Sequence, residues 1–232
     1  MSATTTRDKI LEAALKLFSQ KGFLGATTRE IAREAGVAEV TLFRHFPSKE
    51  SLFEEVIRRY SFLPTLEGIL PGLEQAGYEE ALLEIARRCL EKLEERKDVI
   101  RIMLAERQHY PSKVKRIFRG FIGDMIRMLA DYFRQLQARE ILRDFDPDVG
   151  AKSFLGSLFA YVNFLGFFLG TSGRGGHDDR FAEEFVKIFI EGTIMNRSAK
   201  GNHGNKAARE VRGRQADKRN PSSRRTIRGG LC

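Results

Sequence analysis

The chain has 232 residues and a formal net charge of +9, and 42% of its residues are hydrophobic. This apolar content is enough for a sizeable core and excludes a wholly disordered chain. Two cysteines, Cys89 and Cys232, are too few for a disulfide framework or a thiolate metal site, so we expect a reducing compartment. The first residues, MSATTTRDK, contain no apolar run, which predicts a cytoplasmic protein without a secretory signal.

The positive charge is concentrated at one end of the sequence. Residues 198–232 contain ten Lys or Arg and two Asp or Glu, a net +8, whereas residues 1–197 contain thirty and twenty-nine, a net +1. The high overall charge is therefore no reason to expect that the body of the chain binds nucleic acid. Because residues 198–232 have almost no apolar side chains, we predict that they form a disordered basic tail.

The N-terminal part is predicted to contain four helices. From Thr4 to Phe23, apolar residues recur at steps of three and four, the spacing of one buried helix face, and Gly22 is expected to end that helix. The capping-box sequence at 27–30, TTRE, starts a short helix that stops at Gly36. Residues 38–45 form another short helix.

A fourth helix, capped by Ser48, is expected to run to about Tyr60 and to complete an N-terminal domain over residues 1–60. Residues 61–78 contain two prolines and three glycines and are predicted to be a connecting segment. The larger C-terminal domain then covers residues 79–197.

The C-terminal domain is predicted to be helical as well. Amphipathic segments indicate helices over 79–94, 98–109 and 112–138. The sequence Asp146-Pro147-Asp148 predicts the start of a helix that runs to about Gly170, and a last helix spans about 178–196. No alternating strand pattern of useful length occurs, so we predict an all-α fold of about nine helices.

Three residues in the second helix, the turn after it and the third helix have the spacing of a helix-turn-helix. Two short helices that cross steeply need a small residue at their contact, a turn residue that tolerates positive φ, and an apolar anchor on the second helix. Ala32, Gly36 and Leu42 supply these in order. The pattern alone is moderately specific, because helical hairpins in plain scaffolds also use Ala and Gly.

The third helix is expected to present an apolar pair outward. Its inward positions are taken by Val37, Leu42 and Phe46, which leaves the outer side to Glu39, Val40, Phe43 and Arg44. An exposed Val–Phe pair suits the DNA major groove, where thymine methyl groups are apolar. Lys49 stands in the first turn after the Ser48 cap, where a phosphate would favour a cation and where the alternative is an ordinary solvated lysine.

Residues 27–53, TTREIAREAGVAEVTLFRHFPSKESLF, resemble the DNA-binding domain of TetR/AcrR-type transcriptional regulators, and the similarity covers about the first sixty residues. The resemblance implies a homodimer that represses transcription and releases its operator when a small ligand enters the C-terminal domain. Position by position, it implies that the DNA contacts are made by Thr28, Arg29, Ala38, Glu39, Val40, Thr41, Phe43, His45 and Lys49, beside the outward Arg44.

Two residues depart from the family pattern. Phe43 stands where the family usually has tyrosine, so a hydroxyl bond to phosphate is missing, and Ala38 replaces the serine or threonine that would cap the recognition helix. Arg29 is the preferred guanine reader, whereas Glu39 either interacts with its own helix dipole or accepts from a cytosine amino group. His45 contacts phosphate, supports the turn before Pro47, or does both.

The uncharged segment 153–173 allows two interpretations, a dimer core or a membrane span. We favour the dimer core, because the resemblance implies a four-helix dimer interface built from the last two long helices. The predicted interface residues are Phe159, Phe164, Gly166, Phe167, Gly170, Phe185 and Phe189. A small effector pocket is expected among residues 79–165, lined by Met103, Phe118, Phe121, Met125 and Tyr161, and an apolar effector is favoured because no cluster of buried charges is evident.

An enzyme is the main alternative class. The histidines at 45, 109, 177 and 203 are scattered, and none forms a pair with metal-ligand spacing. Residues 170–176, GTSGRGG, lack the Gly-Lys-Ser/Thr of a phosphate-binding loop. We therefore expect no catalytic site, metal or cofactor. A third alternative is non-specific nucleic-acid binding through the basic tail 198–232.

Overall fold

The computed structural model describes residues 5–165 and 177–195, and within these ranges the chain forms helices and turns without a strand. The predicted all-α fold of about nine helices is confirmed. The helices belong to one compact unit that ends at Thr193. The predicted basic tail, residues 198–232, lies outside the described residues. The predicted domain boundaries at residues 60, 78 and 197 stay predictions.

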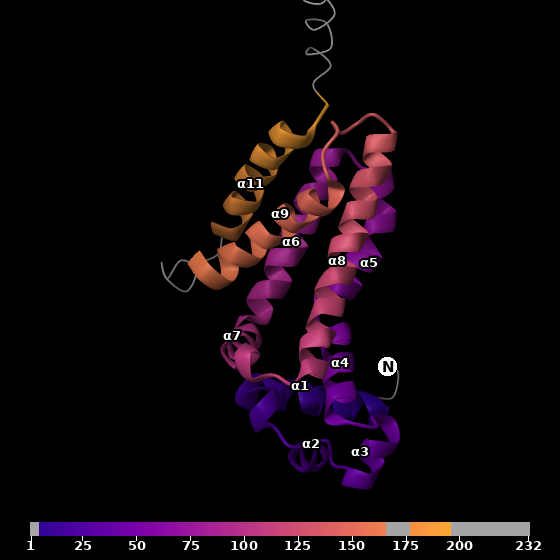
Figure 1. Ribbon diagram of the computed structural model, residues 1–232, viewed down its shortest axis with the longest axis vertical. Helices are drawn as coiled ribbons and strands as arrows, with labels where there is room; N and C mark the ends of the chain where they lie inside the picture. Colours follow the sequence, from indigo (N-terminus) through magenta and orange to yellow (C-terminus); the bar gives the residue numbers. More distant parts are fainter. Residues whose placement is uncertain (1–4, 166–176, 196–232) are drawn as a thin grey trace, which may run out of the picture. The chain divides into compact units, whose positions relative to one another are not determined.

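The first four helices are α1 (Thr6–Gly25), α2 (Thr28–Glu34), α3 (Glu39–His45) and α4 (Lys49–Tyr60) (Figure 1). Their starts follow local capping rules: Thr27 and Glu30 form the predicted capping box, and Ser48 caps α4 by accepting from the Ser51 amide. Ala38 precedes α3 without a side-chain cap, as predicted. We call α1 to α4 the head.

The first helix departs from prediction at its end. Gly22 has a φ of +72° and leaves helical geometry, but the chain resumes its turn and α1 ends at Gly25. The predicted inward residues of α1 are buried, namely Ile10, Leu11, Ala14, Leu17 and Phe18. Phe18 and Phe53 of α4 meet edge to face at 5.1 Å between ring centroids, in the centre of the head's core.

The segment predicted as a connection contains a helix. α5 (Leu63–Ile69) is followed by the 3-10 turn η1 (Leu70–Glu74). Pro64 is compatible with α5 because it stands in the first turn, where its missing N–H has no helical partner. Leu66 is fully buried against the C-terminal core, so this segment contributes to packing.

The remaining helices are α6 (Tyr78–Glu95), α7 (Lys97–Glu106), η2 (Arg107–His109), α8 (Ser112–Ala138), α9 (Pro147–Ala160), the π-helical turn η3 (Tyr161–Leu165) and α11 (His177–Thr193). α8 packs on α9, and α11 packs on α6 (Figure 1). Asp146 caps α9 as predicted, by accepting from the amides of Asp148 and Val149. The predicted continuation to Gly170 lies partly outside the described residues.

Candidate nucleic-acid interface

The turn between α2 and α3 has the predicted helix-turn-helix geometry. Ala32 is 2% exposed where α2 meets α3, Gly36 has a φ of +68°, and Leu42 is fully buried. The Val37 amide donates to the Ala32 carbonyl at 3.0 Å, which closes the turn. All three predicted roles are therefore confirmed.

The outer side of α3 is exposed and includes large apolar side chains. Val40 is 61% exposed and Phe43 is 43% exposed, while Arg44 and His45 are exposed beside them. Phe46, by contrast, is buried, and the Arg7 guanidinium lies 5.1 Å from the centroid of its ring. The head thus holds α3 from within and leaves its opposite side uncovered.

Glu39 has a partner that sequence reasoning did not find. The Thr28 hydroxyl donates to a Glu39 carboxylate oxygen at 2.7 Å, which ties the first turn of α2 to the first turn of α3. Two residues predicted to contact DNA are therefore held by each other. Arg29, next to Thr28, is exposed and forms no ion pair within the described residues.

Lys49 is half-buried, and its ammonium lies 4.5 Å from the centroid of the Phe23 ring. Burial lowers the pKa of Lys49, against the opposing effect of the Glu106, Glu50 and Glu30 carboxylates. Its predicted phosphate contact stays a prediction. The structure shows a contact within the head instead, between the ammonium and the Phe23 ring.

Glu106, at the end of α7, connects that helix to the kink in α1. Its carboxylate accepts from the Phe23 amide at 2.8 Å, from the Leu24 amide at 3.3 Å and from the Tyr110 hydroxyl at 3.0 Å. Burial, together with this bond to Glu106, raises the pKa of Tyr110. Local sequence patterns did not indicate this contact, because Glu106 stands more than eighty positions after the Phe23 and Leu24 amides.

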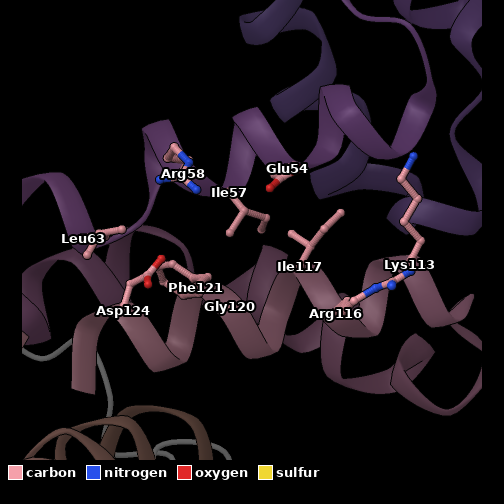
Figure 2. A pocket seen from close by; sticks show the side chains of 10 residues that line it. All are labelled: Glu54, Ile57, Arg58, Leu63, Lys113, Arg116, Ile117, Gly120, Phe121 and Asp124. Atoms are coloured by element: carbon pink, nitrogen blue, oxygen red, sulfur yellow. The ribbon is translucent and has the colours of Figure 1, made fainter. Parts of the chain in front are cut away.

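The predicted effector-lining residues do not come together in one place. Met103 and Phe118 pack against the core of the head, whereas Met125 and Tyr161 pack against the C-terminal core. Phe121 lines a separate cavity of about 310 Å³ between α4 and α8 (Figure 2). The predicted pocket therefore stays a prediction, and the residues named for it are distributed over three environments.

Among the described residues, the predicted dimer residues fall into two groups. Phe159 and Phe164 are 39% and 59% exposed. Phe185 and Phe189 are half-buried and pack on Phe154, at 5.3 and 5.1 Å between ring centroids, so they belong to the protomer's own core as well. The other three predicted interface residues, Gly166, Phe167 and Gly170, lie outside the described residues.

Two structural findings bear on the alternative functions. In residues 5–165 and 177–195, no cluster of three or more His, Cys, Asp or Glu side chains has the arrangement of a metal site. Over the same ranges, every helix is too short or too polar to cross a bilayer. The proposed span at 153–173 extends beyond these ranges.

Comparison with protein families matches most of the chain. Residues 10–56 match the tetR family of bacterial regulatory proteins, and residues 80–191 match the C-terminal domain of AefR-like transcriptional repressors.

Individual relatives match over nearly their full length. The HTH-type transcriptional regulator YvkB of Bacillus subtilis is 29% identical over 188 residues, which is 81% of this chain and 96% of the relative. The solved structure of the flavonoid-responsive regulator FrrA is 32% identical, covers 82% of this chain and 97% of its own, and has a TM-score of 0.63. A TetR-family regulator of Mesorhizobium loti is 25% identical over 84% of this chain and 100% of its own, with a TM-score of 0.70.

Proposed function

Because this chain belongs to the tetR family of bacterial regulatory proteins, we propose that it is a cytoplasmic transcriptional repressor that binds a palindromic operator as a homodimer. The two recognition helices of the dimer enter successive major grooves, about 34 Å apart. A small effector bound by the C-terminal helices releases the operator. The AefR-like repressor match of residues 80–191 supports the direction of regulation, and the flavonoid response in the name of FrrA supports a small-molecule effector.

The observation that carries this proposal is the uncovered outer side of α3. Val40 and Phe43 are 61% and 43% exposed on the same side of α3, and Arg44 lies beside them. Leaving two large apolar side chains in water costs free energy unless a partner covers them. The major groove provides apolar thymine methyl groups for the pair and phosphates for the arginine.

The direct test is selection of binding sites from random duplexes by the purified chain. We expect enrichment of an inverted repeat whose half-sites are one helical turn apart. Placing that sequence over a promoter should reduce transcription in a purified system when the protein is added. Failure to enrich any duplex would contradict the proposal, and increased transcription would reverse its direction.

Arg29 provides a test of base reading. Arg29→Ala should relax the preference at one base pair in each half-site and cost about 1–3 kcal/mol of specific binding free energy. The measurement is a titration of the selected operator and of single-base variants. Arg139→Ala, at the exposed end of α8, removes the same charge outside the head and should leave the base preference unchanged. An equal loss on every duplex would assign Arg29 to phosphate contact.

Lys49 provides a test of phosphate contact. Lys49→Met keeps an unbranched stem against Phe23 and removes the charge. We expect binding to weaken on all duplexes alike, and the slope of log affinity against log salt to flatten by about one. A lower thermal stability with an unchanged salt slope would assign Lys49 to the Phe23 contact alone.

A further inference from the structure

The cavity between α4 and α8 has an apolar middle and charged ends. Ile57 of α4 faces Ile117 of α8 across it, and Leu63 and Phe121 complete the apolar wall (Figure 2). Its volume of about 310 Å³ is at the lower end of the range of about 300–1,000 Å³ for small-molecule sites. The cavity is open to solvent along its rim, where Glu54, Arg58, Lys113 and Arg116 are exposed, and it has room for a small organic molecule with an apolar body.

Cations outnumber acids around this apolar middle. Figure 2 shows Arg58 toward one end of the cavity and Lys113 and Arg116 toward the other. Within the described residues, neither Arg58 nor Arg116 forms an ion pair. The Lys113 ammonium is 3.5 Å from the Ser48 hydroxyl, at the outer limit of a hydrogen bond.

Two carboxylates also line the cavity, and only one of them is neutralised. Asp124 pairs with Arg127 on the next turn of α8. Glu54 has no ion-pair partner within the part of the chain that the structure describes. Because neither carboxylate pairs with Arg58 or Arg116, both guanidinium groups are available to a ligand. The unpaired Glu54 carboxylate would oppose the approach of an anion.

We propose that this cavity is a binding site for a small amphipathic anion, with an apolar body between Ile57 and Ile117 and a carboxylate or sulfonate bound by Arg116 or Arg58. Guanidinium groups suit such ligands because their planar donors match the two oxygens of a carboxylate. This ligand class differs from the apolar effector expected from the sequence. The charged groups around the cavity come from two helices far apart in the chain, so their grouping was not visible in the sequence.

The position of the cavity connects the ligand to the head. α4 follows the recognition helix α3 directly, and Ile57 and Arg58 lie on α4 while Ile117 and Arg116 lie on α8. A ligand that contacts both helices changes DNA affinity if it binds the DNA-bound and free conformations unequally. This link to DNA release rests on the proposed function, whereas binding to the cavity does not.

Other occupants fit the cavity less well. The chain's own tail, residues 198–232, carries a net positive charge and would be repelled by the three cations. DNA phosphate would satisfy the cations but would leave the apolar wall uncovered. The experiments below separate these occupants from a small anion.

The first experiment measures octanoate binding to the full chain by calorimetry in the absence of DNA. We expect saturable binding that weakens as salt is raised, with octanol and octylamine each at least about tenfold weaker, because they lack the charge-assisted bonds to arginine. Equal binding of octanoate and octanol, or no binding of octanoate, would overturn the proposal.

The second experiment fills the cavity without disturbing the fold. A Cβ on Gly120 would meet no atom within 4 Å, and a leucine is a better helix former than glycine, so Gly120→Leu should fold normally. We expect octanoate affinity to fall at least about tenfold, because the leucine side chain would occupy the space of the ligand's apolar body. Gly123→Leu is the matched control on the same helix, since Gly123 does not line the cavity. Unchanged affinity in Gly120→Leu would overturn the proposal.

Charge variants provide effects of opposite sign. Arg58→Gln combined with Arg116→Gln should weaken octanoate binding about tenfold, whereas Glu54→Gln should strengthen it about threefold by removing the opposing charge. A gain of affinity cannot result from misfolding. If the double arginine variant lost DNA affinity and kept octanoate affinity, the cations would belong to DNA binding and the proposal would be wrong.

Operator binding is measured separately, with and without saturating octanoate. A weaker operator complex in the original chain, but not in Gly120→Leu, would support the link from the cavity to the head. If octanoate bound the cavity and the operator affinity did not change, the link would fail and the binding site would stand. If the chain bound no duplex at all, the proposed function would fail while the calorimetry still decided the binding site.

Discussion

At the scale of single residues, several side chains predicted to contact DNA have contacts within the protein. Thr28 holds Glu39, and Lys49 lies over Phe23. The family resemblance predicts DNA contacts for all three of Thr28, Glu39 and Lys49. These two kinds of contact are compatible, because a side chain that is held in place loses less conformational entropy when it binds.

Among the contacts within the protein described above, the one between Gly22 and Glu106 has the largest expected effect on stability. Gly22 has φ +72° and ψ 179°, a region that only glycine adopts readily. A Cβ at this position would lie 2.2 Å from the Glu106 Oε1, and would displace the carboxylate from the Phe23 and Leu24 amides. Backbone strain and the lost hydrogen bonds would therefore both lower the free energy of unfolding.

We predict that Gly22→Ala lowers the free energy of unfolding by about 3 kcal/mol. Gly36→Ala is the matched control, since Gly36 also has a positive φ but a Cβ there would meet no atom within 4 Å, and its expected cost is about 1 kcal/mol. Urea unfolding measures both variants. Equal losses would contradict a role for Glu106 at this position.

At the scale of the helices, capping residues determine where the head's elements begin. Glu30 closes the start of α2 by accepting from the Thr27 amide at 3.1 Å, and it also accepts from Lys21 at 2.7 Å. The hydrogen bond from Lys21, followed by those from Thr27, lowers the pKa of Glu30 to about 2. The ionised form of Glu30 is therefore favoured by folding.

This pKa shift predicts a pH dependence. A carboxyl whose pKa falls from 4.5 to about 2 on folding stabilises the protein fully above pH 4.5, and that stabilisation is lost as the pH falls toward 2. Glu30→Gln should therefore be less stable than the original chain at pH 7, and the difference should narrow below pH 4.5. Urea unfolding across this pH range measures the difference in stability. Glu12→Gln removes a carboxylate at an exposed position of α1 and is the charge control. A constant difference at every pH would count against the assignment.

At the scale of the whole molecule, the family resemblance predicts that the proposed homodimer uses the exposed side of α9. Phe185 and Phe189 pack on Phe154, so substitutions there would damage the protomer's core and the dimer together. Phe159 is 39% exposed and can be changed without opening that core. It is the better position for a test of association.

We predict that Phe159→Lys converts the dimer to a monomer, because a buried lysine without a partner is costly at an interface. Sedimentation velocity measures the change, and operator affinity should fall in parallel. Ile122→Lys, at an exposed apolar position of α8, is the control and should remain dimeric. A Phe159→Lys protein that stayed dimeric would place the interface elsewhere.

Features that depend on near neighbours were determined by the sequence. The Thr27–Glu30 box, the Ser48 cap, the Asp146-Pro147 start and the Ala32, Gly36, Leu42 series each involve residues within about one to three helical turns, so their geometry follows from helix rules. The family resemblance was also carried by one continuous segment. These are the features that the structure confirmed.

Only the tertiary structure decided which distant residues meet. Glu106 reaches the amides of α1, Lys49 covers Phe23, and Arg58 and Arg116 surround one cavity. The predicted effector residues were separated for the same reason, because periodicity identifies an inward helix face but not the partner against which it packs. Helical rules act over a few residues, whereas the pairing of faces depends on how all the helices fill the interior together.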